Sequence, residues 1–259
     1  MKPLVTPNPW QPLRRFTTAR IALGRAGDSL PTGALLAFGL AHAQARDAVH
    51  QPLDRARIGA QLADAGLPCI QVHSSALDRV AYLRRPDWGR KLDSASREAL
   101  FRHAPAGTSC DVAFVLADGL SARAVEAHAV AVLRQVLPKL EGWRVAPVVV
   151  AEQARVALGD EIGEVLNANQ VVVMIGERPG LSSPDSLGLY LTHSPRVGRT
   201  DAERNCISNV RTEGLSYEQA ATTLAYLLDA ARKLGRSGIE LKDESGALPP
   251  GSARLADAG

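Results

Sequence analysis

The sequence has 259 residues, of which 46% are hydrophobic and 22% charged, and its 30 basic and 27 acidic side chains give a formal net charge of +3. This length and composition are ordinary for a globular protein of one large or two small domains, and they exclude a chain that is disordered throughout. The basic residues are scattered and form no stripe that could follow a phosphate backbone, so nucleic acid is excluded as an expected partner.

The N-terminal part is expected to begin with an arm and to continue as helices. Residues 1–13 contain four prolines, which fix the backbone and remove hydrogen-bond donors, so they predict an extended arm or tail. Residues 14–108 are predicted to be a mainly helical region, with helices over 16–23, from Thr32 and after Pro52.

The predicted helix that opens near Thr32 is unusually rich in apolar side chains. They are too densely spaced for a surface helix with a narrow stripe, which indicates burial against something large. The side chains concerned are Leu35, Leu36, Phe38 and Leu40. Either the helix caps a sheet of this chain or it faces a partner subunit.

Further along the chain, apolar runs alternate with helical patterns. The expected segments are a strand at 69–74, a helix over 94–104, a strand in 110–121, a helix over 121–140, a strand in 145–152, a helix in 159–168, strands in 170–180 and 188–195, and a helix over 216–235. Such alternation predicts an α/β fold with a Rossmann-like, mostly parallel sheet flanked by helices, over residues 109–240. Residues 241–259 are expected to be a partly ordered tail.

In a sheet of this kind, ligands bind outside the carboxyl ends of the strands. The segments expected at that edge are Asp118–Ser121, Ala151–Val156, Gly176–Gly180 and His193–Arg196. The charge-rich stretch 196–211 is interpreted as a solvated loop or, alternatively, as a surface that faces a partner.

Several common chemistries lack their motifs. The sequence contains neither G-x-G-x-x-G nor G-x-x-x-x-G-K-[ST], so a nucleotide site of either standard kind is not expected. Ser121 is the one candidate for a hydrolase nucleophile, and it lacks the G-x-S-x-G context. The six histidines and three cysteines are not grouped as metal ligands, and so few cysteines favour a reducing cytoplasm. No stretch reaches the ~18 apolar residues of a membrane span.

Three segments in the second half of the chain carry a family resemblance. ARVALGDEIGEVL at 154–166, VVVMIGERPGLSSPDSLGLYLTHSPR at 171–196 and DAERNCISNVRTEG at 201–214 together resemble the small (light) subunit of ethanolamine ammonia-lyase. RRFTTARIALGRAG, YLRRPDWGRKL and DVAFVLADGLS extend the resemblance over most of the chain. GERPGL followed by SPR and NCISN at this spacing is highly specific to that family.

The resemblance implies an α/β domain that clamps adenosylcobalamin against a large barrel subunit. The two subunits form a hetero-oligomer that converts ethanolamine to acetaldehyde and ammonia by radical chemistry, with the catalytic groups expected in the large subunit and none in this chain. Carried over by motif, the cofactor contacts are Val156, Glu177 and Cys206. The chain lacks the Asp-x-His-x-x-Gly string, since Asp47 and His50 have the wrong spacing, so the cofactor is expected to be base-on.

Each of these assignments also has a physical reading. A corrin carries amide side chains whose N–H groups Glu177 could accept, whereas without its motif Glu177 would be a surface carboxylate paired with Arg178 or Arg196. Val156 would supply an apolar contact and Cys206 a small polarisable one, although either residue alone would be interpreted as core.

The loops near these residues have two readings. Asp118, Gly119 and Ser121 are most simply a turn and a helix N-cap, and alternatively they line the pocket for the cofactor's nucleotide tail. Gly176 and Gly180 are expected to let the backbone approach the ligand closely.

The large subunit also gives the apolar helix of residues 33–50 an expected partner, because obligate interfaces are large and apolar. Two other functions remain open: a non-catalytic cobalamin-binding module that acts without the lyase, and an orphan Rossmann-like oxidoreductase. The expected location is the cytoplasm, and a place within a bacterial microcompartment is left open.

Overall fold

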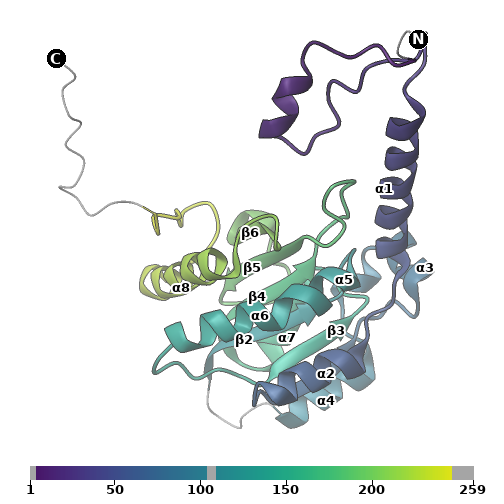
Figure 1. Ribbon diagram of the computed structural model, residues 1–259. Coiled ribbons are helices and arrows are strands. Elements are labelled where there is room, and N and C mark those ends of the chain that lie inside the picture. The colour runs from purple at the N-terminus through teal and green to yellow at the C-terminus, as the bar shows by residue number, and fades with distance from the viewer. Residues whose placement is uncertain (1–3, 104–108, 247–259) are drawn as a thin grey trace, which may run out of the picture.

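A computed structural model describes residues 4–103 and 109–246, which form one six-stranded sheet with helices on both faces (Figure 1). The strand order is β1-β3-β2-β4-β5-β6. The strands are β1 (Cys69–His73), β2 (Cys110–Ala117), β3 (Val148–Glu152), β4 (Ala168–Gly176), β5 (Leu187–His193) and β6 (Arg204–Val210). Strands β1 to β4 are parallel, and β5 and β6 continue the sheet as antiparallel strands. The predicted α/β class with a mostly parallel sheet is confirmed.

The α-helices are α1 (Thr32–His50), α2 (Arg55–Asp64), α3 (Arg79–Arg84), α4 (Ser94–His103), α5 (Ala122–Ala124), α6 (Val130–Val136), α7 (Leu158–Val165) and α8 (Tyr217–Leu234). One core cluster joins α2, α5, α6 and α8 to one face of the sheet, and a second joins α4 and α7 to the other. The central strand β2 shows why two cores form. Phe114 packs into the first cluster and Val115 into the second, because successive side chains of a strand point to opposite faces.

Most helices begin where the sequence predicts them, including α1 at Thr32, α2 after Pro52 and α4 at Ser94. The long helix predicted over 121–140 is present, although a π-helical turn at Val125–Ala129 separates α5 from α6.

The helix predicted over 16–23 is wrong. A short 3-10 helix, Gln11–Phe16, comes first, and the chain then folds back so that Thr6 and Arg25 pair as an antiparallel bridge. Ala22 and Gly24 have φ values of +52° and +79°, which a continuous right-handed helix does not allow.

The interpretation of 196–211 as a solvated loop is also wrong for its second half, which forms β6. The buried positions of this strand are Arg204, Ile207 and Val210, three residues apart, so it lacks the period-two apolar alternation by which strands are found in a sequence. The outer edge of β6 is covered at both ends: Leu215 bridges to Val210, and Ile239 N donates to Ala202 O just before the strand. The side chain of Asn205 fixes the segment that carries Ile239, because it forms hydrogen bonds with Gly238 N and Gly238 O.

The sheet crosses the predicted segment boundary at residue 109, because β1 lies within 14–108 and pairs with β3. Of the tail predicted at 241–259, the structure describes only residues up to 246, and the remainder lies outside the described residues.

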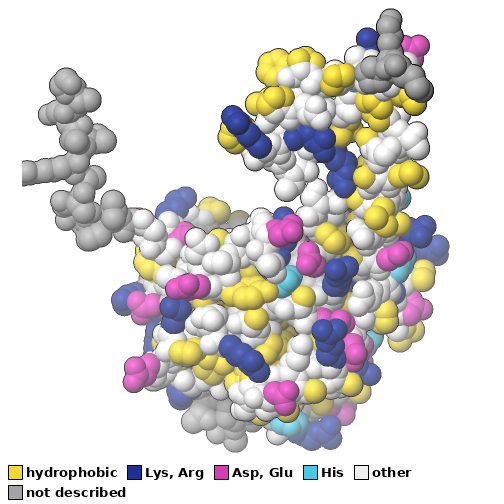
Figure 2. Space-filling model, in the orientation of Figure 1, with side chains coloured by type: hydrophobic (Ala, Val, Ile, Leu, Met, Phe, Trp, Pro, Cys, Tyr) yellow, Lys and Arg dark blue, Asp and Glu magenta, His cyan; other side chains and the backbone are white. Residues whose placement is uncertain are grey.

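Helix α1 and the segment before it project from the body of the protein (Figures 1 and 2). The interpretation of α1 as a cap on the sheet is therefore wrong. Leu35, Leu36 and Leu40 are 56%, 67% and 62% exposed, and only Ala41 and Ala48 of this helix are buried. No helix among the described residues is both long enough and apolar enough to cross a membrane.

Candidate functional site

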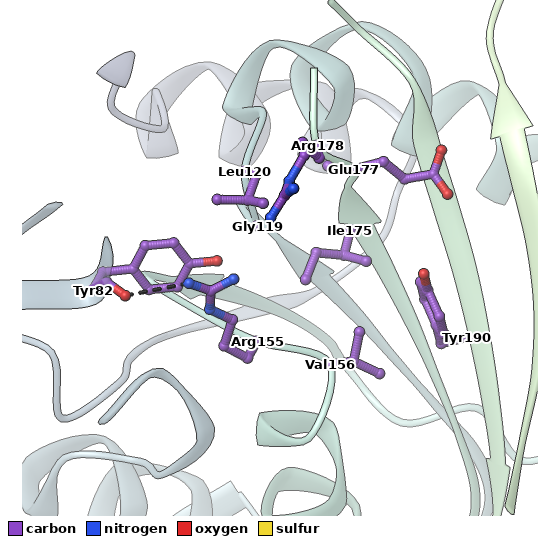
Figure 3. Close-up of a pocket in the computed structure, with 10 residues that line it drawn as sticks. Tyr82, Gly119, Leu120, Arg155, Val156, Ile175, Glu177, Arg178 and Tyr190 are labelled. Atoms are coloured by element: carbon purple, nitrogen blue, oxygen red, sulfur yellow. Dashed lines mark hydrogen bonds between the residues drawn. The ribbon is translucent and has the colours of Figure 1, made fainter. Parts of the chain in front are cut away.

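A cavity of about 450 Å³ opens at the carboxyl ends of β2 and β4 and beside the segment that follows β3 (Figure 3). From β2 the chain goes to β3 on one side and then returns to β4 on the other, and such a reversal of strand order opens a crevice at the sheet edge. The residues that line the cavity are Tyr82, Gly119, Leu120, Arg155, Val156, Ile175, Gly176, Glu177, Arg178 and Tyr190.

Two glycines let the loops after β2 and β4 touch. Gly119 has a φ of +55°, and a Cβ there would lie 2.3 Å from Gly176 O. A Cβ on Gly176 would lie 2.0 Å from Ser121 O. The absence of a side chain at Gly176 is thus needed for contact between two protein loops, and Gly176 also lines the cavity.

Asp118 fixes the turn that carries the next part of the site. Its two carboxylate oxygens accept from Gln153 N at 2.8 Å and Ala154 N at 2.9 Å, and Arg79 Nη1 lies 3.4 Å away. Burial raises the pKa of Asp118 to about 6, against the lowering effect of these hydrogen bonds and of Arg79. The side chain of Asp118 therefore holds the backbone directly before Arg155, while Asp118 O accepts from Ser121 N at 3.1 Å in the turn that the sequence predicts.

Arg155 forms one wall of the cavity with Tyr82. Its guanidinium carbon lies 4.1 Å from the centre of the Tyr82 ring, and its Nη2 donates to Tyr82 O at 3.3 Å. The Tyr82 hydroxyl donates to Ala154 O at 3.0 Å, and burial raises the pKa of this phenol. Arg155 Nε is buried without a hydrogen-bond partner in the described structure, so it could donate to an acceptor that enters from outside.

Glu177 follows β4, and its side chain extends toward β5, away from Tyr82 and Arg155 (Figure 3). Its Oε2 accepts from Ser186 Oγ at 2.5 Å and from Asn209 N at 3.2 Å. The alternative reading of a surface ion pair with Arg178 or Arg196 is not found within the described ranges. The carboxylate is instead held at one oxygen and has acceptor capacity left at the other.

The other two predicted site residues differ in their relation to the cavity. Val156 is half-buried and lines it, next to Arg155. Cys206 is exposed on β6 and lies directly opposite Tyr190, whose side chain lines the cavity. Desolvation of the sulfur raises the pKa of the Cys206 thiol, which leaves it neutral. The structure therefore brings Val156 and Glu177 to the same cavity, whereas Cys206 lies on β6 opposite Tyr190 and is not among the lining residues.

Three of the four segments expected at the carboxyl edge of the sheet lie there, and the fourth does not. Asp118–Ser121, Ala151–Val156 and Gly176–Gly180 meet around the cavity, but His193 lies at the opposite edge of the sheet. Because β5 is antiparallel to β4, its last residue pairs with Gln170, near the start of β4. His193 N donates to Ser237 Oγ at 2.8 Å, and burial lowers the pKa of its ring.

Ser121 caps α5, as expected from the sequence. Its Oγ accepts from Ala124 N at 3.3 Å and donates to Pro184 O at 2.8 Å, so the hydroxyl is committed to local structure. Within residues 4–103 and 109–246, no group of three or more His, Cys, Asp or Glu side chains could hold a metal ion.

Three polar side chains of the cavity, Tyr82, Arg155 and Tyr190, were given no role from the sequence, although Arg155 lies within the predicted edge segment Ala151–Val156. Tyr190 sits two positions after Gly188 in a predicted strand, so period-two alternation would have put it on one face. Tyr82 belongs to a segment that lies far from the cavity in sequence, and only the packing of α3 against the turn after β3 brings it there.

Comparisons with known proteins cover nearly the whole described chain. Residues 7–242 match the family described as ethanolamine ammonia-lyase light chain (EutC). The ethanolamine ammonia-lyase small subunit of Pseudomonas fluorescens (strain SBW25) is 56% identical over 241 residues, 92% of this chain and 87% of that protein. The proteins of the same name from Ralstonia nicotianae and Azotobacter vinelandii are 57% and 58% identical, covering 92% and 93% of this chain and 90% of each relative.

Proposed function

Because this chain belongs to the family of ethanolamine ammonia-lyase small (light) subunits, we propose that it is the cobalamin-binding subunit of such a lyase. In this proposal it acts in the cytoplasm, in a hetero-oligomer with a large subunit, and together they convert ethanolamine to acetaldehyde and ammonia. The name of the relatives supports the lyase activity and the existence of a larger partner.

The cofactor proposed is base-on adenosylcobalamin, and the cavity offers the groups that it requires. When bound, adenosylcobalamin supplies the radical that starts the reaction by homolysis of its cobalt–carbon bond. Glu177 accepts hydrogen bonds from amide N–H groups, and Val156 and Tyr190 supply apolar surface. The single observation that carries this proposal is that Val156 and Glu177, two motif positions 21 residues apart, line the same cavity.

Each of these residues binds or orients, and none transfers a proton. Ser186 and Asn209 hold one oxygen of Glu177, so the carboxylate is oriented before any ligand arrives. The neutral thiol of Cys206 and the hydroxyl of Tyr190 extend this surface toward β6. The reacting groups for ethanolamine belong, in this proposal, to the large subunit.

A cavity of about 450 Å³ takes only part of a molecule as large as cobalamin, so a second wall is needed. The projecting N-terminal part is suited to meet the subunit that would supply it. Of the exposed large apolar side chains on the described residues, most lie here: Leu4, Val5, Trp10, Leu13, Phe16, Ile21, Leu30, Leu35, Leu36, Phe38 and Leu40. An apolar surface of this extent is typical of an obligate interface.

The charge of the projecting part indicates what the partner surface is like. Residues 4–31 contain four arginines against one aspartate, a net charge of +3. Arg20 Nη2 donates to Leu181 O at 3.3 Å, which joins this segment to the loop between β4 and β5. We therefore propose that α1 and the segment before it dock on an apolar surface of the large subunit with acidic residues at its rim.

The test is to titrate adenosylcobalamin into this chain, into the large subunit and into their mixture, and to follow absorbance and acetaldehyde. Firm binding and ethanolamine-dependent acetaldehyde are expected only in the mixture. Glu177→Ala should weaken cofactor binding by roughly tenfold or more, since it removes a charged hydrogen-bond acceptor, whereas Glu98→Ala on the exposed face of α4 should not. A mixture without cobalamin binding, or NAD-dependent turnover without cobalamin, would overturn the proposal.

A further inference from the structure

We propose that a second cavity, next to the first, binds the phosphodiester of the cobalamin nucleotide tail through Arg90 and Arg155. This inference rests on the proposed function. The second cavity has a volume of about 460 Å³ and shares Arg155 and Val156 with the first as a common wall. Its other charged lining residues are Arg90, Arg199, Arg204 and Asp201.

Two of the four arginines are already neutralised by carboxylates. Arg204 makes a buried bidentate pair with Asp160, at 2.7 and 2.6 Å. Arg199 pairs with Glu203 and also donates to Ser194 O. These two guanidinium groups are therefore held by the protein and shape the floor of the cavity.

The other two arginines have no carboxylate within 4 Å in the part of the chain that the structure describes. Arg90 is exposed and Arg155 half-buried, and neither forms an ion pair there. Asp201 is the one acidic residue that lines the cavity; it extends into solvent and lies 3.5 Å from Arg204 Nε. The guanidinium groups of Arg90 and Arg155 thus carry positive charge that no carboxylate among the described residues neutralises, on the wall next to Val156. The Nε of Arg155 also lacks a hydrogen-bond partner there.

The backbone fixes Arg90 beside Arg155. Arg90 ends the short 3-10 helix Trp88–Arg90, and Arg155 N donates to Gly89 O at 2.8 Å. A Cβ on Gly89 would lie 3.0 Å from Arg155 Cγ and 3.0 Å from Gln153 O, so the two segments pack tightly. Two guanidinium groups carried by these adjoining segments match a phosphodiester, which has one negative charge shared by two free oxygens.

Cobalamin has one part for each cavity: a corrin for the first and a phosphodiester for the second. Its corrin is a broad amide-fringed ring, and its nucleotide tail leaves the edge of that ring through a phosphodiester. A ring on Val156 and Glu177 in the first cavity would bring the tail over the shared wall to Arg90. A free phosphate ion has the same chemistry for the second cavity alone, so the experiment must separate these two sources.

The experiment compares cobalamin with cobinamide, which keeps the corrin but lacks the phosphodiester, ribose and base. Dissociation constants for both are measured by equilibrium dialysis on the complex of this chain with the large subunit. Arg90→Gln should weaken cobalamin binding roughly tenfold and leave cobinamide binding unchanged, since a hydrogen bond to a charged group contributes about 1.5–3 kcal/mol. Arg90→Lys, which keeps the charge, should weaken cobalamin binding less than Arg90→Gln does.

Arg85→Gln is the matched control, because Arg85 lies five residues away and pairs with Asp87 on the exposed surface. It should change neither constant. Inorganic phosphate at millimolar concentration should compete with cobalamin and not with cobinamide. An equal effect of Arg90→Gln on both ligands, or competition of phosphate with neither, would overturn the role of the second cavity. Wild-type complex that binds neither corrinoid would instead overturn the proposed function.

Discussion

Ser186 Oγ donates to Glu177 Oε2 at 2.5 Å, across the end of β4 and the start of β5. Ser186 is buried, whereas Glu177 is half-buried at the mouth of the cavity. The serine is therefore a positioning residue for the carboxylate. Ser186→Ala should weaken adenosylcobalamin binding to the two-subunit complex about fivefold, because loss of the hydrogen bond that orients the carboxylate is expected to cost the ligand about 1 kcal/mol. Absorbance titration measures this change, with the exposed Ser182→Ala as control. Unchanged affinity in Ser186→Ala would show that Glu177 needs no such support.

Asp118→Asn should change how stability depends on pH. The pKa of Asp118 is raised from 3.8 to about 6, so between these values the folded protein holds a proton that the unfolded chain releases. The stability due to this proton is present below about pH 4 and is lost as pH rises to about 6. The free energy of unfolding of wild type relative to Asp118→Asn should therefore fall by roughly 3 kcal/mol over this window. Urea unfolding from pH 4 to 8 measures the difference, and a difference independent of pH would contradict the assignment.

The buried pair of Asp160 and Arg204 should show strong coupling. Asp160→Asn or Arg204→Met alone leaves a buried charge without its partner, which costs about 3–5 kcal/mol, whereas the double variant should cost less than the sum. A double-mutant cycle from denaturant unfolding gives the coupling. The exposed pair Asp229 and Lys233 on α8, 2.6 Å apart, is the control and should couple by about 0.5 kcal/mol or less. Additive effects of the Asp160 and Arg204 substitutions would contradict this prediction.

Leu36→Asp should weaken association with the large subunit while leaving the chain folded. Leu36 is 67% exposed on α1, so its replacement removes little core packing, but in an assembled interface the new charge would be buried without a partner. The dissociation constant from analytical ultracentrifugation should rise tenfold or more. Phe101→Asp on α4, at a site 55% exposed, is the control for a charge placed elsewhere. Equal effects of the two variants would count against docking through α1.

The sequence predicts the four parallel strands better than the antiparallel edge formed by β5 and β6. β2 and β4 are apolar runs followed by glycine-containing turns, and their burial on both faces leaves a pattern that is easily read. β6 has no such apolar run. Its polar residues are instead stabilised by particular contacts, such as that of Arg204 with Asp160. The direction of β5 cannot be read from its residues either, which is why His193 was expected at the wrong edge.

The candidate site was only partly predictable for a similar reason. Val156 and Glu177 follow strands whose carboxyl ends meet, so topology alone brings them together. Tyr82 and Arg155 meet through the hydrogen bond from the Tyr82 hydroxyl to Ala154 O and through the turn held by Asp118. Such long-range contacts depend on side-chain packing, which no local pattern encodes.

The contacts at the two ends of β6 affect how copies of this protein associate at high concentration. An open outer strand is a template on which a foreign chain can add its own strand, and that is a route to fibres and mispaired oligomers. Here Leu215 and Ile239 occupy that edge at either end of the strand, and Asn205 holds the second cover in place. These contacts hinder the addition of a foreign strand beyond β6, although α1 of the same protein leaves apolar side chains exposed.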